Sequence, residues 1–460
     1  MIKFDRMELS SLDLLLSPFY IILIIAVSRY IKNRNRKNPF YEYYVHGMVV
    51  KLVGAVVLCL IYVYYYKGGD TIGYFNSATY IMNLATKNFS VFIDVFLGNN
   101  SPENYSCFDE STGYPMYWRD DHAFFVCRFF IPFIFLACKS FVVSAMLLAW
   151  LCYTGIWKLY LLFCNSFPDI KKQLAVSILF IPSVVFWGSG LMKDAITISA
   201  VGWYTFAFSA FFIKRKFNLS NGFAILISGY LLIVIKPYIM FALLPGSILW
   251  LTIEYRNKIK DKVLRFIALP MLLAIGMGGG YLVLVQMSGS LGKYSLDNVL
   301  ERAVVVQNDL KQDYYNGKTF DIGSFDASVS SMLGKAHLAI ASALFRPYLW
   351  DVQNPVMLLS ALENTYILLL TLFLMIRLKF IGFFKYIGMN PLLLFSVLFA
   401  LFFAFAVGIS TPNFGSLVRL RIPCIPFFVS SLFVIRHFYD KQKIEGIDSN
   451  SKRLVGLKPS

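Results

Sequence analysis

Charged side chains interrupt the long apolar runs of this chain at only a few places, and they are the first candidates for chemistry. Lys193 and Asp194 follow a glycine-containing corner, residues 186–192, between two such runs. A charged side chain at the centre of a membrane helix costs about 2.5–3.5 kcal/mol on insertion scales. We therefore expect this corner to lie at a membrane surface or in a polar cavity.

Asp70 directly follows two glycines at the end of another apolar run, so the backbone can turn sharply and present its carboxylate. The carboxylate could act as general base for a sugar hydroxyl. It could instead bind a divalent cation, Mg²⁺ or Mn²⁺, that neutralises a diphosphate leaving group. The alternative is a solvated aspartate at a helix end.

Asp120, Asp121 and His122 form a second polar cluster at the far end of the same loop. Carboxylate and imidazole are metal-ligand types, but adjacent residues on one helix point in different directions and cannot all reach one ion. Solvated interfacial charge is the favoured interpretation, and we include the cluster only as a supporting part of the Asp70 site.

Five basic residues near the ends of apolar runs are candidates for phosphate binding: Lys193, Lys236, Arg346, Arg419 and Arg421. Asn413 is a supporting candidate. Asp194 is either a supporting site residue or the partner of its neighbour Lys193. Residues two apart cannot share a helix face, so one of Arg419 and Arg421 should point inward. Its anionic partner would be a diphosphate, which a guanidinium grips well, or an internal carboxylate such as Glu363.

The composition indicates a helical membrane protein. Hydrophobic residues make up 58% and aromatic residues 17% of 460 residues, well above the apolar share of soluble proteins. The formal charge of +17 lies mostly in short loops between apolar runs, as the positive-inside rule requires, so we do not infer a nucleic-acid partner. Six of seven cysteines lie in apolar runs, which gives no sign of a disulfide framework.

Apolar runs and charged loops predict about 11 crossings, a re-entrant or interfacial segment at 123–137 and an all-α fold. The predicted spans are 14–31, 47–66, 141–164, 174–187, 195–213, 223–235, 238–251, 263–287, 355–376, 391–408 and 416–436. Four basic residues within 32–37 place that loop in the cytoplasm and the N-terminus outside. Lys51, near an inner span end, is expected to snorkel to the surface.

We expect one transmembrane domain, residues 1–437, followed by a basic cytoplasmic tail, 438–460. Two large outer (periplasmic) loops, 67–122 and 288–354, should each contain an amphipathic helix. The apolar positions are Ile81, Leu84, Ala85, Phe89 and Phe92 in the first loop, and Leu296, Val299, Leu300, Ala303 and Leu310 in the second. With this topology, the candidate residues all fall on the outer face.

The sequence Gly68-Gly69-Asp70-Thr71-Ile72-Gly73-Tyr74 and the amphipathic stretch after it resemble the GT-C class of membrane glycosyltransferases. Those enzymes use polyprenyl-phosphate-linked sugars and carry an acid at the start of the first large outer loop. The resemblance implies that Asp70 is the catalytic or metal-binding acid. In that class the acid follows the first span, whereas here it follows the second.

The many spans, large outer loops and outer arginines are also similar to O-antigen and capsule polymerases of the Wzy kind. That resemblance implies that Arg346, Arg419 and Arg421 hold an undecaprenyl-diphosphate glycan. Aromatic belts at membrane surfaces explain Tyr348 and Trp350 without a function.

Together these features favour a bacterial inner-membrane glycosyltransferase or polysaccharide polymerase, with a polyprenyl-linked glycan, membrane lipids and other glycan-assembly membrane proteins as partners. A flippase or transporter is the first alternative, with Lys236-Pro237 as a broken helix. A scaffold of an envelope complex is the second.

Overall fold

The computed structural model describes residues 8–256, 261, 299–310, 312 and 319–455. Within these ranges the chain is helical, and the only β pairing is an isolated bridge between Thr319 and Asn413. The predicted span at 263–287, its glycines and Leu296 lie outside the described residues.

Seven helical segments of the described chain are long and apolar enough to cross a membrane: Ser11–Arg34, Pro39–Tyr65, Phe141–Ser166, Lys193–Ile213, Pro237–Arg256, Pro355–Gly388 and Pro391–Ser410. The bent pair Phe414–Leu420 and Ile425–Lys443 would make an eighth. These helices support a multi-pass helical membrane protein, as the composition predicts. The predicted number of about 11 crossings is not confirmed.

The chain divides into two compact units. Unit 1 comprises Met1–Leu162 and Leu179–Met240, and unit 2 comprises Phe163–Ile178 and Phe241–Ser460. The predicted single transmembrane domain with a separate tail stays a prediction.

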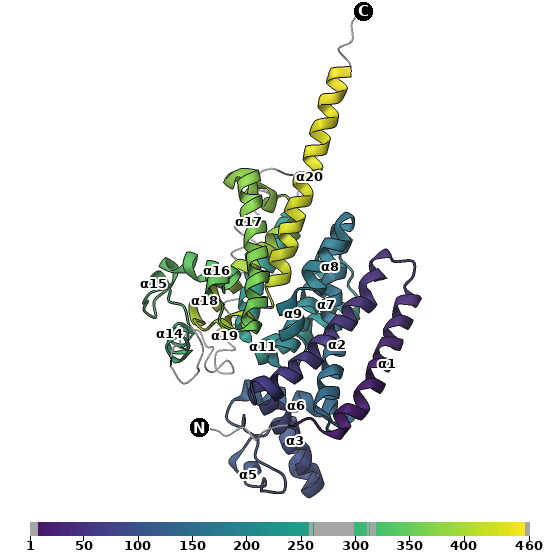
Figure 1. The fold of residues 1–460 in the computed structure, drawn as a ribbon, viewed down its shortest axis with the longest axis vertical. Helices are drawn as coiled ribbons and strands as arrows, with labels where there is room; N and C mark the ends of the chain where they lie inside the picture. The colour runs from purple at the N-terminus through teal and green to yellow at the C-terminus, as the bar shows by residue number, and fades with distance from the viewer. Residues whose placement is uncertain (1–7, 257–260, 262–298, 311, 313–318, 456–460) are drawn as a thin grey trace, which may run out of the picture. The chain divides into compact units, whose positions relative to one another are not determined.

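Unit 1 begins with α1 (Ser11–Arg34), whose start is fixed by polar contacts. Ser10 and Asp13 form a capping box at its N-terminus. The other oxygen of Asp13 accepts hydrogen bonds from Ser140 Oγ at 2.6 Å and from the Val142 amide at 3.0 Å. These bonds tie the start of α1 to the start of α7 (Phe141–Ser166), and α1 then lies beside α2 (Tyr44–Leu60), as Figure 1 shows.

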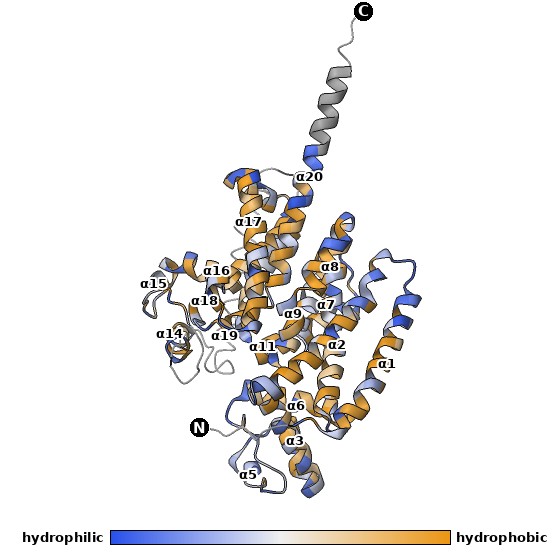
Figure 2. Ribbon diagram, in the orientation of Figure 1, coloured by the Kyte–Doolittle hydropathy of each residue, from blue (hydrophilic) through white to orange (hydrophobic). Residues whose placement is uncertain are grey.

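The remaining helices of unit 1 are η1 (Pro39–Tyr43), η2 (Ile61–Tyr65), α3 (Asp70–Lys87), α4 (Phe89–Leu97), α5 (Pro102–Tyr105), α6 (Asp121–Leu136), α9 (Pro182–Trp187), α10 (Lys193–Phe208), η4 (Ser209–Ile213) and α11 (Leu219–Ile235). A Cβ on Gly155 of α7 would lie 2.0 Å from the Ser199 carbonyl of α10, so glycine permits this close crossing. Apolar residues colour most of α1, α2 and α6 in Figure 2, as expected for helices in a bilayer.

The segment predicted as the first outer loop contains two main helices, α3 and α4, where one interfacial helix was predicted. Ile81 and Leu84 are fully buried in α3, because α3 packs against α6. Asn88 caps the start of α4, where the exposed side chains Phe89, Ile93 and Leu97 recur every four residues. The exposed apolar stripe thus belongs to α4, and the apolar face of α3 is part of the core of unit 1.

Unit 2 contains η3 (Pro168–Ile170), α8 (Lys171–Leu179), most of α12 (Pro237–Arg256), α14 (Val299–Leu310), α15 (Val329–Gly334), α16 (Ala336–Phe345), η7 (Leu349–Asp351), α17 (Pro355–Gly388), α18 (Pro391–Ser410), α19 (Phe414–Leu420) and α20 (Ile425–Val455). A Cβ on Gly408 of α18 would lie 2.1 Å from the Ala339 carbonyl, so α16 packs closely on α18. The apolar helix α16 lies in a segment that was predicted to be an outer loop.

Two predicted spans are broken rather than continuous. The helix predicted at 174–187 divides into α8 and α9 before Pro182, which cannot donate a backbone hydrogen bond. The span predicted at 416–436 divides into α19 and α20, which are bent by 69°. Arg421 lies at this second break. Because irregular backbone frees carbonyl groups, both breaks need polar partners inside the protein.

Candidate functional site

The corner after α9 is buried within unit 1, and a buried lysine completes it. Residues 188–192 are inaccessible to solvent, and Lys51 Nζ donates a hydrogen bond to the carbonyl of Gly188. Lys51 is only 3% exposed, so it does not snorkel as predicted. Its ammonium group instead satisfies a free carbonyl at the C-terminal end of α9, which is where a cation is favourable.

Asp194 and Lys236 form a buried ion pair. The Lys236 Nζ lies 2.5 Å from Asp194 Oδ1, and the two residues are 5% and 0% exposed. Asp194 lies in the first turn of α10, where the helix dipole also favours a carboxylate. The loop between α11 and α12 is thereby fixed to the start of α10. Asp194 pairs with Lys236, whereas the neighbour Lys193 was the partner considered from the sequence.

Lys193 and Asp70 are brought to the same face of α3. The Lys193 Nζ lies 5.9 Å from the centre of the Tyr74 ring, near the limit for a cation–π contact. Tyr74 is four residues after Asp70, so the two side chains share one face of α3. Both Asp70 and Lys193 are half-buried. Tyr74 thus links the two residues, because it shares a helix face with Asp70 and its ring lies near the Lys193 ammonium.

The polar cluster of Asp120, Asp121 and His122 makes hydrogen bonds within unit 1. Asp120 caps α6 by accepting from the Ala123 amide, and Asp121 accepts from Asn100 Nδ2 at 2.9 Å. His122 Nδ1 lies 2.5 Å from the carbonyl of Val234, which can only accept, so this nitrogen carries the proton. The three side chains bond in different directions, as adjacency on a helix predicts.

Arg421 is fully buried in unit 2 and bonds only to neutral acceptors. Its Nη1 donates to the carbonyls of Ala343 at 2.7 Å and Arg346 at 2.9 Å, and its Nη2 donates to Asn364 Oδ1. The Nε atom has no hydrogen-bond partner among the residues that the structure describes. The inward arginine was predicted to need a diphosphate or Glu363. Its hydrogen bonds go to the neighbour, Asn364, and to two backbone carbonyls, while Glu363 interacts with it electrostatically.

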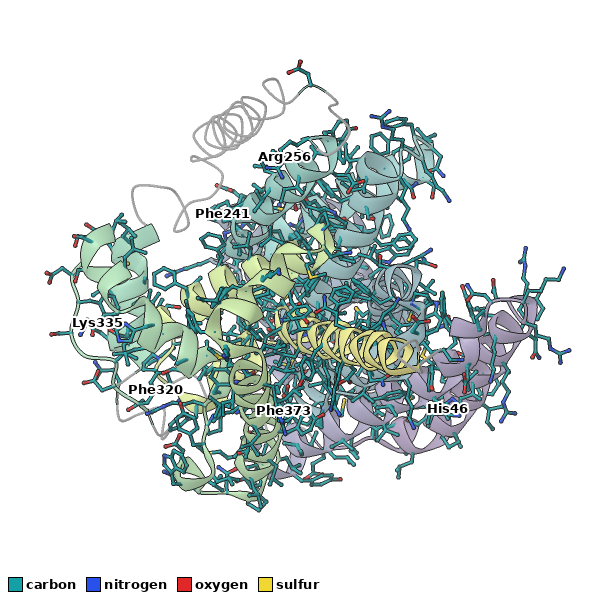
Figure 3. All side chains as sticks on the ribbon, turned by 90° about the horizontal axis from the view of Figure 1, so that it is seen from above. His46, Phe241, Arg256, Phe320, Lys335 and Phe373 are labelled. Carbon is teal, nitrogen blue, oxygen red and sulfur yellow. The ribbon has the colours of Figure 1, made fainter. Side chains whose placement is uncertain are left out.

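Arg346 lies between two aromatic rings. Its guanidinium carbon is 5.1 Å from the centre of the Phe320 ring, labelled in Figure 3, and 5.3 Å from that of Tyr348. Phe320 in turn contacts Phe414 with centroids 5.4 Å apart, and Tyr348 stacks on Trp350 at 4.8 Å. The side chain of Arg346 is half-buried, and its guanidinium has no hydrogen bond or ion pair within the described part of the chain.

Arg419 lies on α19, and Asn413 directly precedes that helix. Arg419 is half-buried in the last turn, whereas Arg421 is fully buried, so one arginine points inward as the spacing predicts. Asn413 is the N-cap of α19, and its Oδ1 accepts from the Ser416 amide at 3.1 Å. The neighbouring Pro412 carbonyl accepts from the Phe320 amide at 3.0 Å. Asn413 therefore supports the segment that presents Phe320.

A protein-only metal site is absent from the described residues, where no group of three or more histidine, cysteine, aspartate or glutamate side chains gathers. A cation at Asp70 would need further oxygen ligands from the phosphates of a substrate. Binding of Mg²⁺ or Mn²⁺ by Asp70 thus stays a prediction.

Sequence reasoning missed Asn364 and Phe320, and it named Lys51 but predicted the wrong role for it. Lys51 was a detectable signal, since it is a lysine inside an apolar run. Asn364 was detectable as an amide within the apolar helix α17, one residue after the glutamate that drew attention. Phe320 carried no signal, because one phenylalanine among 44 is unremarkable.

The predicted site residues fall into two groups, one in each unit. Unit 1 holds Asp70, Lys193 and the pair of Asp194 with Lys236, and unit 2 holds Arg346, Arg421 and the residues around α19. In comparisons with known proteins, no family model matches this chain, and neither a curated protein nor a solved structure matches it.

Proposed function

We propose that this chain is a membrane glycosyltransferase or polysaccharide polymerase. It would transfer glycan from an undecaprenyl-(di)phosphate carrier at the outer face of a bacterial inner membrane. The proposal includes the topology inferred from the charged loops, with about 11 crossings, the N-terminus outside and the C-terminus in the cytoplasm.

The observation that carries the proposal is the guanidinium of Arg346. It is half-buried between Phe320 and Tyr348, and it makes no hydrogen bond or ion pair with the described residues. A planar fork of N–H donors fits two oxygens of a phosphate, and flanking rings hold the fork without occupying its donors. A guanidinium in this position is better suited to binding an anionic ligand than to a purely structural role.

Asp70 and Lys193 supply the second part of the proposal. In the proposed step, an acceptor hydroxyl attacks the anomeric carbon and its proton passes to the Asp70 carboxylate. The bond from that carbon to the carrier phosphate breaks, and the phosphate leaves with the electron pair, so the configuration inverts. Lys193 would hold phosphate, while a cation bound by Asp70 is the alternative to its role as base.

Two of the predicted phosphate ligands suit a structural role better. The ammonium of Lys236 is occupied by Asp194, and the guanidinium of Arg421 is enclosed by protein acceptors. We therefore assign the main substrate contact of the proposal to Arg346, while phosphate binding by Lys193 and by Arg419 stays a prediction.

The test is a deletion strain complemented by single variants. Lipid-linked glycans are extracted, and the surface polysaccharide is separated on a gel. We expect that loss of the protein removes long chains and leaves single units or unmodified acceptor on undecaprenyl carriers. Arg346→Ala should reproduce this loss at normal expression. Full activity in all of Asp70→Ala, Arg346→Ala and Arg419→Ala would refute the site assignment.

The alternative functions give different results in the same strain. Carrier-linked units that accumulate on the cytoplasmic leaflet would identify a flippase, which the buried break between α9 and α10 could serve. An unchanged glycan profile would favour a scaffold of an envelope complex.

A further inference from the structure

Arg346 is presented by a short corner, residues 343–347, between α16 and the start of α17. The corner carries two carbonyls that the Arg421 guanidinium binds, those of Ala343 and Arg346 itself. A third carbonyl, that of Pro347, accepts from Asn364 Nδ2 at 3.2 Å. The peptide groups on both sides of the Arg346 side chain are thus held by buried donors.

Arg421 and Asn364 hold the corner together, because a hydrogen bond joins their side chains. Arg421 Nη2 donates to Asn364 Oδ1, which orients the amide so that its Nδ2 faces Pro347. Both residues are 0% exposed, so water does not compete for these bonds. A planar guanidinium with two terminal NH2 groups can reach three acceptors in fixed directions, whereas the single ammonium of a lysine lacks this fixed planar geometry. We call Arg421 and Asn364 the corner clamp.

We infer that Arg421 is a positioning residue, which holds Arg346 in register with Phe320 and Tyr348 so that its N–H groups are free for a phosphate oxygen. This inference rests on the proposed function. Arg421 would not touch the carrier diphosphate itself, because its side chain is inaccessible and three of its N–H donors are used inside unit 2. Its contribution would be to fix the direction of a neighbour, since a misplacement of about 1 Å can reduce a rate about 100-fold.

The first experiment measures the order of the corner without any assay of activity. A spin label is attached at Leu349→Cys, a position that is 45% exposed, in the full chain with Cys107→Ser and Cys138→Ser. The remaining five cysteines are buried. A label at Leu97→Cys, 75% exposed in unit 1, is the matched control. Arg421→Lys should remove the immobilised component of the spectrum at 349 and leave the spectrum at 97 unchanged.

The second experiment separates positioning from general support of the fold. Transfer by purified full-length protein is measured in bilayers with a lipid-linked glycan, for Arg421→Lys alone, Arg346→Lys alone and the double variant. If Arg421 acts through Arg346, the double variant should lose no more transfer than Arg346→Lys alone, since the two effects are then coupled. Asn364→Ser keeps Arg421 but shortens the link to Pro347. Combined with Arg346→Lys, it should give the same non-additive loss of transfer, and it replaces Arg421→Lys if that variant does not fold.

The outcomes separate two kinds of failure. The positioning role would be overturned if the spectrum of the label at 349 were unchanged in Arg421→Lys, or if the spectra at 349 and 97 changed equally. It would also be overturned if the losses of transfer multiplied in the double variant. Full transfer by Arg346→Ala with a mobilised label in Arg421→Lys would overturn the proposed function of Arg346, and with it the catalytic consequence of the clamp.

Discussion

Lys236 in unit 1 and Arg421 in unit 2 are both buried cations, and their partners differ. Lys236 is 2.5 Å from a carboxylate, that of Asp194. Arg421 donates to two carbonyls and one amide oxygen. An ammonium is a compact charge that desolvates at high cost, so an opposite charge suits it well, although the buried Lys51 of unit 1 is held by the Gly188 carbonyl at the end of a helix. A guanidinium spreads its charge over a plane and is hydrated more weakly, so several dipoles can hold it.

This difference indicates which cations can meet a ligand. Each buried cation uses its donors to fix a turn: the loop between α11 and α12 in unit 1, and the corner before α17 in unit 2. The half-buried cations Lys193 and Arg346 lie close to aromatic rings, and the Arg346 guanidinium makes no hydrogen bond or ion pair with the described residues. A ring face attracts a cation without consuming its N–H groups. The structural and the proposed substrate-binding roles thus fall on different residues within each unit.

The largest expected effect is loss of the carboxylate from the buried pair. Asp194→Ala leaves the Lys236 ammonium buried without its partner, and we expect a loss of about 3–5 kcal/mol in the free energy of unfolding. The thermal unfolding midpoint in detergent measures this effect. Asp94→Ala, at an exposed position of α4, is the matched control and should change stability little.

The double variant Asp194→Leu with Lys236→Met sharpens this test. It removes both charges and fills their volume with apolar groups, so it should recover most of the lost stability. A double variant as unstable as Asp194→Ala would show that packing, and not the unpaired charge, explains the loss.

The second effect concerns Arg346 and uses a variant that keeps the charge. Arg346→Lys retains a cation but loses the planar fork and its stacking between two rings, so we expect transfer to fall about tenfold. The measurement is the rate of transfer at fixed lipid-linked substrate in membranes. Lys67→Arg, at an exposed position of unit 1, is the control and should keep its activity. A fully active Arg346→Lys would mean that Arg346 contributes only its charge.

A smaller effect is expected at the start of α19. Asn413→Ala removes the side chain that caps this helix, so we expect a loss of about 1 kcal/mol in stability. Asn413→Asp keeps an acceptor and should retain most of the stability. Thermal midpoints measured on the two variants give the comparison. If Asn413→Ala reduces transfer strongly at unchanged stability, then Asn413 contacts the substrate and is not only a cap.

The membrane class and most helix positions could be predicted from the sequence, because long apolar runs with basic flanks are a strong local signal. The failures lie where one run contains a break. Pro182 and Pro423 gave local signs of the two breaks, but a proline does not by itself predict the 69° bend between α19 and α20 or the buried partners of Arg421 at that bend. The apolar positions Ile81 and Leu84 were assigned to a membrane surface because periodicity does not distinguish lipid from the neighbouring helix α6.

The types of residue in the candidate site could be predicted from the sequence, but their bonding partners could be predicted only in part. The inward direction of one arginine near 419–421 follows from helix geometry. The choice of Asn364 over Glu363 as its acceptor does not, since that choice depends on tertiary contacts. Likewise, the pairing of Asp194 with Lys236, 42 residues away, could not be separated from pairing with adjacent Lys193.

The smallest expected effect is at an exposed ion pair, which contrasts with the buried one. Lys87 Nζ lies 2.6 Å from Asp109 Oδ2, and both side chains are more than 40% exposed. Hydrogen bonds from Lys87, then from Ser111 and the Thr112 amide, hold the pKa of the Asp109 carboxyl well below its ordinary value. An aspartate with a lowered pKa in the fold stabilises the fold above the unfolded pKa, about 3.9, and this stabilisation is lost as the pH falls through the folded value.

Hydrogen exchange of the amides of residues 107–113, corrected for the intrinsic effect of pH, measures this loss. We expect constant protection from pH 7 down to about pH 4 and a decline below it. Asp109→Asn cannot ionise, so its protection there should already be lower and should not change with pH. The effect should remain local to this loop, because solvent screens an exposed pair and leaves it little weight in global stability. If Asp109→Asn lowered the unfolding midpoint as much as Asp194→Ala, burial would not be the factor that separates the two ion pairs.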